Sequence, residues 1–117
     1  MTTIYAVAAA RTAIGAFGGA LKDQTPGDLG AHVARAAVAR AGIAPEAVGH
    51  VVFGHVITTH PRDHFVGRIA ALGAGLPVET PALTVNRLCG SGLQAILSAA
   101  QAIMLGDCAV ALGGGTE

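Results

Sequence analysis

Apolar residues follow two alternating patterns along the chain. Short runs rich in apolar residues occur at 4–9, 48–57, 82–88 and 108–112. Such runs are typical of parallel strands that are covered on both faces. The segments between them show helical features, so the pattern predicts strands and helices in the order β-α-β-α-β-α-β. We therefore expect an α/β layered fold, with a mainly parallel, mixed sheet and helices on both of its faces.

The first predicted helix has clear signals at both ends. Thr25 suits the N-cap, Pro26 suits the first helical position, and Asp28 adds an acidic group to the first turn. Gly42 is the kind of residue that commonly ends a helix. We expect the apolar stripe of this helix to consist of Leu29, Val33, Ala36 and Ala37.

Two further helices are predicted nearer the C-terminus. Residues 65–74 form a short one, and residues 91–105 form a longer one without any charge. The uncharged stretch 88–106 approaches the length of a membrane span. It contains glutamines and lacks a flanking aromatic belt, so we expect a buried central helix and no membrane association. The large apolar residues on one side of this helix are Leu93, Ile96, Leu97 and Met104, together with Ala100.

The composition narrows the possible function classes. Of the 117 residues, 52% are apolar and 12% are charged, which excludes a disordered polar chain. The seven basic and seven acidic residues form no run of either sign, so the chain lacks the basic stripe that nucleic-acid binding needs. The two cysteines provide neither a disulfide framework nor metal-ligand spacing, and they suit a reducing, cytoplasmic compartment.

The strongest chemical signal lies between the third predicted strand and the long helix. There the sequence reads Asn86-Arg87-Leu88-Cys89-Gly90-Ser91-Gly92. A strand leading into a reactive residue, two glycines and an immediate helix are the features of a nucleophile elbow, with cysteine in the position of serine. Free amides and the positive end of the helix dipole favour a thiolate there and a developing oxyanion. This pattern makes Cys89 a candidate nucleophile.

Two other interpretations use the same residues. A cysteine before a helix is commonly a small buried hydrophobic residue without chemistry. Alternatively, Gly90-Ser91-Gly92-Leu93-Gln94-Ala95 matches G-x-G-x-x-A, the fingerprint of a dinucleotide-binding Rossmann-type module. Glu117, which ends the next strand, would be its ribose-binding acid. The polar strand before the match and the late position of the acid weaken this alternative.

The histidines predict no metal centre. His55, His60 and His64 have no cysteine or paired carboxylate to complete a tetrahedral site, so we expect loop or partly exposed histidines. The neighbouring Arg62-Asp63 is interpreted as a solvated ion pair.

Two features near the C-terminus are interpreted as structural. Cys108 is expected to start a strand and to be inert core. Gly113-Gly114-Gly115 lacks the Lys-Ser/Thr of a phosphate loop and is expected to form a close-packed turn that ends the strand.

Four stretches resemble the thiolase family, the acetyl-CoA C-acyltransferases. Residues 85–96 closely resemble the active-cysteine segment of that family. Residues 11–19 are similar to its N-terminal R-T-x-I-G-x-F-G-G signature, and residues 105–117 to its strand ending in G-G-x-E. Gly54-His55-Val56 lies where the family has its second strand, with histidine where asparagine is often expected. The resemblance covers the whole chain and is nearest to bacterial β-ketothiolases.

The resemblance implies an acyl-CoA acyltransferase that catalyses thiolysis of 3-ketoacyl-CoA or the reverse Claisen condensation. Cys89 would carry the acyl group as a thioester, with its own backbone N–H in an oxyanion hole. The implied partners are acyl-CoA and free coenzyme A, with no cofactor beyond these substrates and no metal. A homodimer or homotetramer in the cytoplasm is expected.

The resemblance also sets an expectation about domain organisation. Residues 1–117 correspond to the N-terminal part of the first thiolase domain. In the family, the catalytic histidines and the second, acid/base cysteine lie downstream of the matching region. We therefore expect residues 1–117 to be inactive by themselves, and a non-catalytic fragment of the fold is the remaining alternative.

Overall fold

A three-stranded parallel sheet forms the centre of the molecule. The computed structural model describes residues 2–117. The strands are β1 (His50–Gly54), β2 (Ala82–Val85) and β3 (Ala111–Gly115), in the spatial order β2-β1-β3. Val51 pairs with Ala82 on one side and with Leu112 on the other, and both ladders are parallel. Because all three strands point the same way, their carboxyl ends meet at one edge of the sheet.

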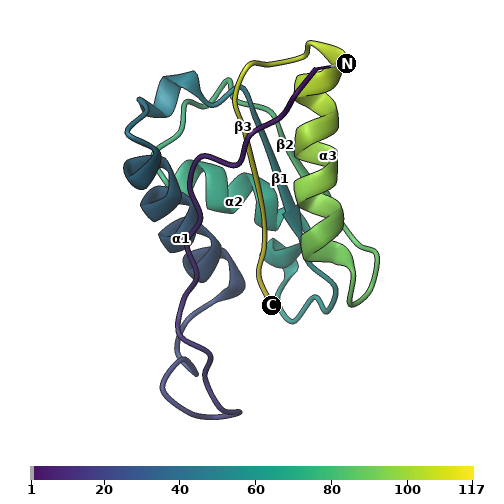
Figure 1. The fold of residues 1–117 in the computed structure, drawn as a ribbon. Helices are drawn as coiled ribbons and strands as arrows, with labels where there is room; N and C mark the ends of the chain where they lie inside the picture. Colours follow the sequence, from purple (N-terminus) through teal and green to yellow (C-terminus); the bar gives the residue numbers. More distant parts are fainter. Residues whose placement is uncertain (1) are drawn as a thin grey trace.

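Helices cover both faces of this sheet. Helix α1 (Pro26–Ala41) and helix α2 (Val66–Gly73) pack against each other on one face, and α3 (Ser91–Leu105) lies on the opposite face (Figure 1). Two short 3-10 helices, η1 (Pro45–Ala47) and η2 (Pro61–Phe65), precede β1 and α2. The predicted α/β layered fold, with helices on both faces of a parallel sheet, is confirmed.

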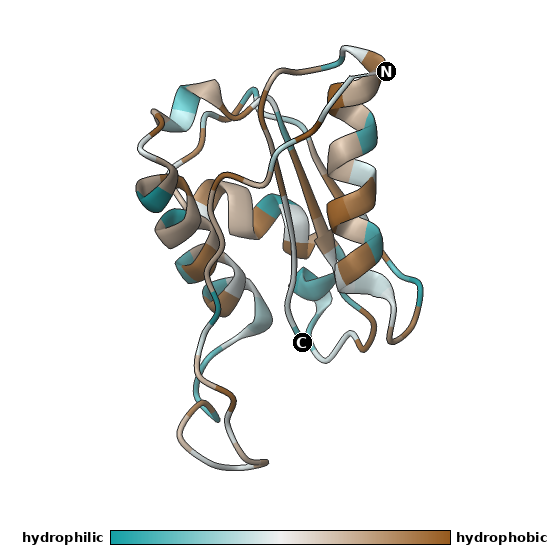
Figure 2. Cartoon of the chain, viewed as in Figure 1, coloured by the Kyte–Doolittle hydropathy of each residue, from teal (hydrophilic) through white to brown (hydrophobic). Residues whose placement is uncertain are grey.

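Alternate residues of β1 supply the two cores. Val51 and Phe53 point toward α1 and α2, where they join Ala34, Val66 and Ala70 in the larger buried cluster. Val52 points the other way and packs with Ala95 and Ala99 of α3. The middle of the sheet is accordingly apolar, and β1 is largely brown in Figure 2, whereas the glycine-rich end of β3 is pale. Alternation of side chains along one strand therefore joins the two helical layers.

Helix α1 begins and ends where the sequence predicts. The Thr25 hydroxyl accepts a hydrogen bond from the Asp28 amide at 3.1 Å, the Asp28 carboxylate accepts one from the Thr25 amide at 3.3 Å, and Gly42 ends the helix in a left-handed conformation. The predicted apolar stripe was wrong, because small residues face α2. A Cβ on Gly27 would lie 2.6 Å from the Ile69 side chain, too close for anything but glycine. The buried residues of α1 are Gly27, Gly30, Ala31, Ala34 and Val38.

Helix α3 also packs on the sheet through its small residues. Glycines in the sheet allow this: a Cβ on Gly54 would lie 2.5 Å from the Ser91 carbonyl carbon, and a Cβ on Gly113 would lie 2.7 Å from Ile96 Cα. The expected buried central helix is therefore only half correct, since its large apolar side chains point away from the sheet and are exposed. The buried residues of α3 are Ser91, Ala95, Ala99 and Ala102.

The uncharged stretch that contains α3 has the length and composition of a membrane span, but part of it is buried in the fold. The stretch Leu88–Leu105 is long and apolar enough to cross a membrane, and 22% of it is buried within the chain. Its buried part is the alanine face that packs on β1 and β3. A helix that packs one face on the sheet and leaves its other face exposed explains the apolar composition as well as a membrane span does.

All four predicted strands differ from the observed ones in extent or existence, and the strand predicted at 48–57 is shorter, at His50–Gly54. Residues 4–9 form no strand, because an apolar run also needs a neighbouring strand for its backbone groups, and here the Ala9 carbonyl accepts from the Arg40 guanidinium instead, at 2.8 Å. Strand β2 ends at Val85, so residues 86–88 belong to a turn region. Strand β3 starts at Ala111 and includes all three glycines, which were wrongly predicted to form a turn. Close packing explains these glycines, since Gly113 and Gly115 approach the α3 backbone and Gly114 lies against the Phe53 ring.

We expect Gly113→Ala to lower the free energy of unfolding by about 1–3 kcal/mol, because the added Cβ would collide with the α3 backbone rather than with a movable side chain. Chemical denaturation of the full-length protein measures this. Gly92→Ala is the matched control, since a Cβ there meets nothing within 4 Å. Equal stability of Gly113→Ala and wild type would contradict the close-packing explanation.

Candidate active site

A strained turn connects β2 to α3 and carries the predicted nucleophile. Leu88 has φ +50°, and it is the one non-glycine residue among residues 2–117 with a positive φ. The Ser91 hydroxyl stabilises this turn, since it donates to the Leu88 carbonyl at 2.6 Å and accepts from the Arg87 amide at 2.7 Å. A left-handed residue directly before the candidate nucleophile fits the sharp, strained strand-to-helix turn of a nucleophile elbow. The strand–turn–helix prediction is confirmed.

Asn86 links the elbow to the loop that follows β1. Its side-chain oxygen accepts from the Leu88 amide at 3.0 Å, and its amide nitrogen donates to the Val56 carbonyl at 3.4 Å. On the other side of the elbow, Arg87 donates to the Gln94 side chain at 2.7 Å. The turn is therefore attached both to the sheet edge and to α3.

Cys89 is exposed at the top of this elbow, as a free thiol. It lies two residues before α3, whose N-cap Gly90 contributes no side-chain hydrogen bond to the first amides of the helix. An uncapped helix N-terminus favours negative charge, through its amide groups and its dipole. Exposure together with this position is what attack on an external electrophile requires.

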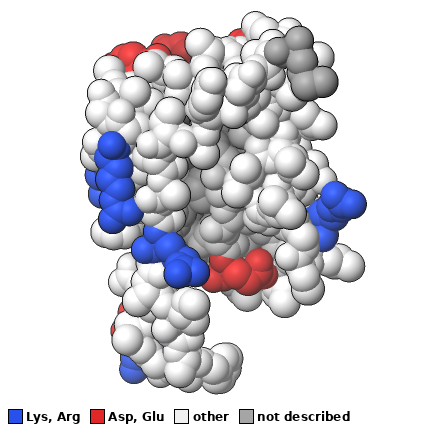
Figure 3. Space-filling model, viewed as in Figure 1, with Lys and Arg blue, Asp and Glu red and all other residues white. Residues whose placement is uncertain are grey.

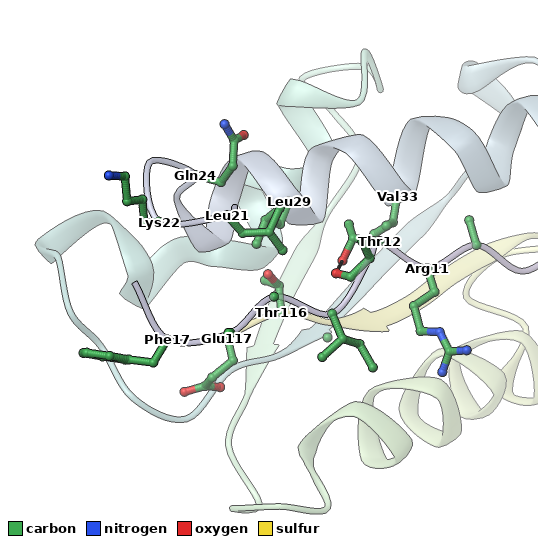
Figure 4. Close-up of a pocket in the computed structure, with 16 residues that line it drawn as sticks. Arg11, Thr12, Phe17, Leu21, Lys22, Gln24, Leu29, Val33, Thr116 and Glu117 are labelled. Carbon is green, nitrogen blue, oxygen red and sulfur yellow. Dashed lines mark hydrogen bonds between the residues drawn. The ribbon is translucent and has the colours of Figure 1, made fainter. Parts of the chain in front are cut away.

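The carboxylate of Glu117 lies at the same edge of the sheet. It accepts hydrogen bonds from two consecutive amides of the loop after β1, Val56 at 3.1 Å and Ile57 at 2.7 Å. Glu117 and Thr116 also line a hollow of about 610 Å³, together with residues 10–17 and the start of α1 (Figure 4). Residues 54–56, 85–96 and 105–117 are thus joined by hydrogen bonds at the carboxyl edge of the parallel strands, where α/β proteins bind ligands, and residues 11–17 line the hollow beside Glu117.

His55 lies in the loop directly after β1, as expected, but the expected partial exposure was wrong. It is 4% exposed, and its Nδ1 lies 2.8 Å from the Thr116 carbonyl oxygen. Since a carbonyl oxygen can only accept, Nδ1 donates in this contact, and the buried Nε2 has no hydrogen-bond partner among the described residues. The position of His55 in the sequence was the available signal for its burial, because it directly follows the strand residues 51–54, all four of which are buried.

Asp63 was also wrongly interpreted, because it forms no solvated pair with Arg62. The carboxyl is 3% exposed and accepts from the Thr59 and His60 amides at 3.0 and 2.8 Å. Burial raises the pKa of Asp63, but these hydrogen bonds outweigh burial and leave the pKa below its ordinary value. Asp63 is therefore the third helical residue of a capping box on η2, whose N-cap is His60. Within residues 2–117, no group of three or more potential ligands could hold a metal ion.

Cys108 lies outside β3, three residues before its start, and is half-buried. Burial raises the pKa of this thiol, and the nearby Asp107 carboxylate raises it further. A raised pKa reduces the thiolate fraction at neutral pH. The two cysteines therefore differ in both access and position.

The sheet order argues against the dinucleotide-binding alternative. In a Rossmann module, the acid that binds the ribose ends the strand next to the glycine-rich one. Here β1 lies between β2, which precedes the glycines, and β3, which precedes Glu117. The Glu117 carboxylate is moreover engaged with the Val56 and Ile57 amides.

Charged side chains are sparse over the face of the molecule seen in Figure 3. The chain carries no net charge, and lysines and arginines form separate groups in this view rather than a continuous stripe. On this face, the described residues 2–117 form no basic stripe of the kind that binds phosphate backbones.

Comparison with known proteins decides the family. The profile of the thiolase N-terminal domain matches residues 4–117, nearly the whole chain. The chain belongs to the thiolase family. Among the thiolases that it matches, beta-ketothiolase BktB of Cupriavidus necator is 61% identical over 114 residues, which is 97% of this chain and 29% of that protein. The acetyl-CoA acetyltransferase of the same organism is 48% identical over 117 residues, which is 100% of this chain and 30% of that protein.

Solved thiolase structures share the fold. Human mitochondrial 3-ketoacyl-CoA thiolase in complex with CoA matches with a TM-score of 0.84 at 44% identity, over 87% of this chain and 26% of that one. The acetyl-CoA acetyltransferase of Bacillus anthracis matches with a TM-score of 0.88 at 45% identity, over 93% and 27%. The chain thus spans less than a third of the length of these thiolase relatives.

We expect iodoacetamide at neutral pH to alkylate Cys89 of the folded full-length thiolase well before Cys108, because Cys89 is exposed and Cys108 is half-buried with a raised pKa. Labelling of Cys108 should rise as the pH increases and its thiol ionises. Peptide mass mapping of a time course measures both rates, with the unfolded protein as the control in which the two converge. Equal labelling in the folded protein would contradict the assignment of Cys89 as the reactive thiol.

Proposed function

We propose that this chain forms the N-terminal part of an acyl-CoA acyltransferase in which Cys89 accepts the acyl group. The observation that carries the proposal is the exposed cysteine on a strained strand–turn–helix elbow, at the edge where the thiolase-like stretches meet. The named relatives are a β-ketothiolase, acetyl-CoA acetyltransferases and a 3-ketoacyl-CoA thiolase, which support thioester substrates.

The reaction proceeds in two balanced steps. The Cys89 thiolate attacks the 3-keto carbon of a 3-ketoacyl-CoA, the bond between C2 and C3 breaks, and C2 takes a proton to leave as acetyl-CoA. The thiolate of free coenzyme A then attacks the acyl-cysteine, restoring the Cys89 thiolate and releasing the shortened acyl-CoA. In the reverse direction, a base removes the C2 proton of acetyl-CoA, and the carbanion attacks the acyl-cysteine.

Sulfur is the appropriate nucleophile for this exchange. An acyl-cysteine is a thioester like its precursor and its product, so the acyl group moves at nearly constant free energy in either direction. An oxygen ester on serine would have a lower free energy than these thioesters and would trap the acyl group. Covalent catalysis thus splits the transfer into two steps of similar difficulty.

Stabilisation of the tetrahedral intermediate is assigned to the elbow backbone. We place the N–H of Cys89 at the acyl oxygen, as one donor of an oxyanion hole. The neighbouring amides of Leu88, Gly90 and Ser91 already donate hydrogen bonds to acceptors within the elbow. These hydrogen bonds keep the turn rigid, and a rigid, preorganised donor stabilises an oxyanion effectively.

The proposal extends to the partners and the setting of the complete enzyme. Coenzyme A and its thioesters serve as the substrates, with no additional cofactor, and the base at C2 comes from outside residues 1–117. The exposed apolar side of α3, which includes Leu93 and Leu105 at 65% and 79% exposure, supports a larger assembly that covers it. We further propose a homodimer or homotetramer in the cytoplasm, where the free thiols of Cys89 and Cys108 stay reduced.

We expect Cys89→Ala to abolish thiolysis of acetoacetyl-CoA by the full-length protein, while coenzyme A binding and thermal stability change little, since an exposed side chain contributes little packing. Turnover assays and calorimetric titration measure these quantities. Cys108→Ala is the matched control and should retain turnover. If Cys89→Ala kept even a tenth of the wild-type rate, another residue would be the acyl acceptor and the proposal would fail.

A further inference from the structure

A continuous set of contacts joins Glu117 to the elbow across three separate segments. The carboxylate accepts from the Val56 and Ile57 amides, the Val56 carbonyl accepts from the Asn86 side chain at 3.4 Å, and the Asn86 oxygen accepts from the Leu88 amide at 3.0 Å. Leu88 directly precedes Cys89. This series of hydrogen bonds therefore ends at Leu88, the residue whose backbone conformation sets the direction of Cys89.

The other end of this path is firmly attached to the sheet. Thr116, the residue before Glu117, makes three hydrogen bonds: its amide donates to the Gly54 carbonyl at 3.1 Å, its hydroxyl donates to the Pro26 carbonyl at 2.9 Å, and its carbonyl accepts from His55 at 2.8 Å. His55 is itself buried. These contacts come from the end of β1, the residue after it and the start of α1, so the backbone that carries Glu117 has little freedom to shift.

The strained residue is where such support matters. A non-glycine residue with φ near +50° is strained and persists only where its surroundings enforce it. The Asn86 side chain supplies part of that enforcement through the Leu88 amide. Asn86 is exposed, and its other end is held by a carbonyl whose loop Glu117 fixes. Without Glu117, that loop and the Asn86 side chain both gain freedom.

We propose that Glu117 is a positioning residue for Cys89, acting through Val56 and Asn86 on the conformation of Leu88. This inference rests on the proposed acyl transfer to Cys89. Glu117 touches neither the thiol nor the acyl group in this scheme. It orients the nucleophile, and misplacement by about 1 Å is enough to slow such a reaction by up to about 100-fold.

The test follows single-turnover acyl transfer from a 3-ketoacyl-CoA to the full-length protein in the absence of free coenzyme A. Glu117→Ala removes both acceptors, so the limiting rate at saturating substrate should fall about 10–100-fold. The substrate concentration for half-maximal rate should change by less than about twofold, because binding contacts are untouched. Glu117→Gln keeps one carbonyl oxygen as acceptor and should recover part of the rate, and it serves as the folded variant if Glu117→Ala does not fold.

Asp28→Ala is the matched control for lost stability. Asp28 caps α1 with the same chemistry, since its carboxylate accepts from the Thr25 amide at 3.3 Å and from the Thr25 hydroxyl at 2.7 Å. This variant should lose thermal stability while its acyl-transfer rate stays at the wild-type value. If Asp28→Ala slowed acyl transfer as much as Glu117→Ala does, the effect of Glu117 would be general destabilisation, and the proposal would be wrong.

A double-mutant cycle tests the route through Asn86. When Asn86 is already alanine, adding Glu117→Ala should slow acyl transfer by less than about twofold further, since both changes release the same element. Fully additive losses, or a Glu117→Ala rate equal to the wild-type rate, would overturn the inference while leaving acyl transfer to Cys89 intact. A wild-type protein that forms no acyl-Cys89 would overturn the proposed function itself, and this inference with it.

Discussion

The close approach of α3 to the sheet is the constraint on which the rest of the structure depends. Gly54 and Gly113 leave no room even for a methyl group between the strands and the α3 backbone, with distances of 2.5 and 2.7 Å from a hypothetical Cβ. The first turn of α3 therefore lies directly on the end of β1. This contact determines where the short connection from β2 must turn, and hence where Cys89 is presented.

The turn that results is strained, and the molecule supports it from both sides. Ser91, buried under the elbow, holds the Leu88 carbonyl and the Arg87 amide from the α3 side. Asn86 holds the Leu88 amide from the side of the sheet edge. Because the strands are parallel, the loop after β1 and the end of β3 reach the same edge, and their hydrogen bonds with Glu117 extend the support. Strand direction thus gathers distant segments into one site.

Local signals in the sequence were sufficient for the layered fold, the cap at Thr25 and the elbow around Cys89. These features depend on neighbouring residues. The buried helix faces, the pairing of residues 4–9 and the strand character of Gly113–Gly115 depend on tertiary packing, and there the predictions failed. The sequence prediction placed the large apolar residues of α1 and α3 on the faces that contact the core. In the structure these helices lie so close to their neighbours that mainly alanine and glycine fit on the buried faces. The link from Glu117 to Asn86 joins residues remote in sequence, and no local pattern indicates it.

We propose that the acyl group is bound to the Cys89 sulfur as a thioester, and peptide mapping detects this bond directly. The full-length protein is incubated with acetyl-CoA alone, quenched in acid, digested and analysed by mass spectrometry, with and without neutral hydroxylamine to cleave thioesters. We expect one hydroxylamine-sensitive acetyl group on the peptide that contains Cys89, and none on the peptide that contains Cys108. An acetyl group found elsewhere, or one that resists hydroxylamine, would contradict this proposal.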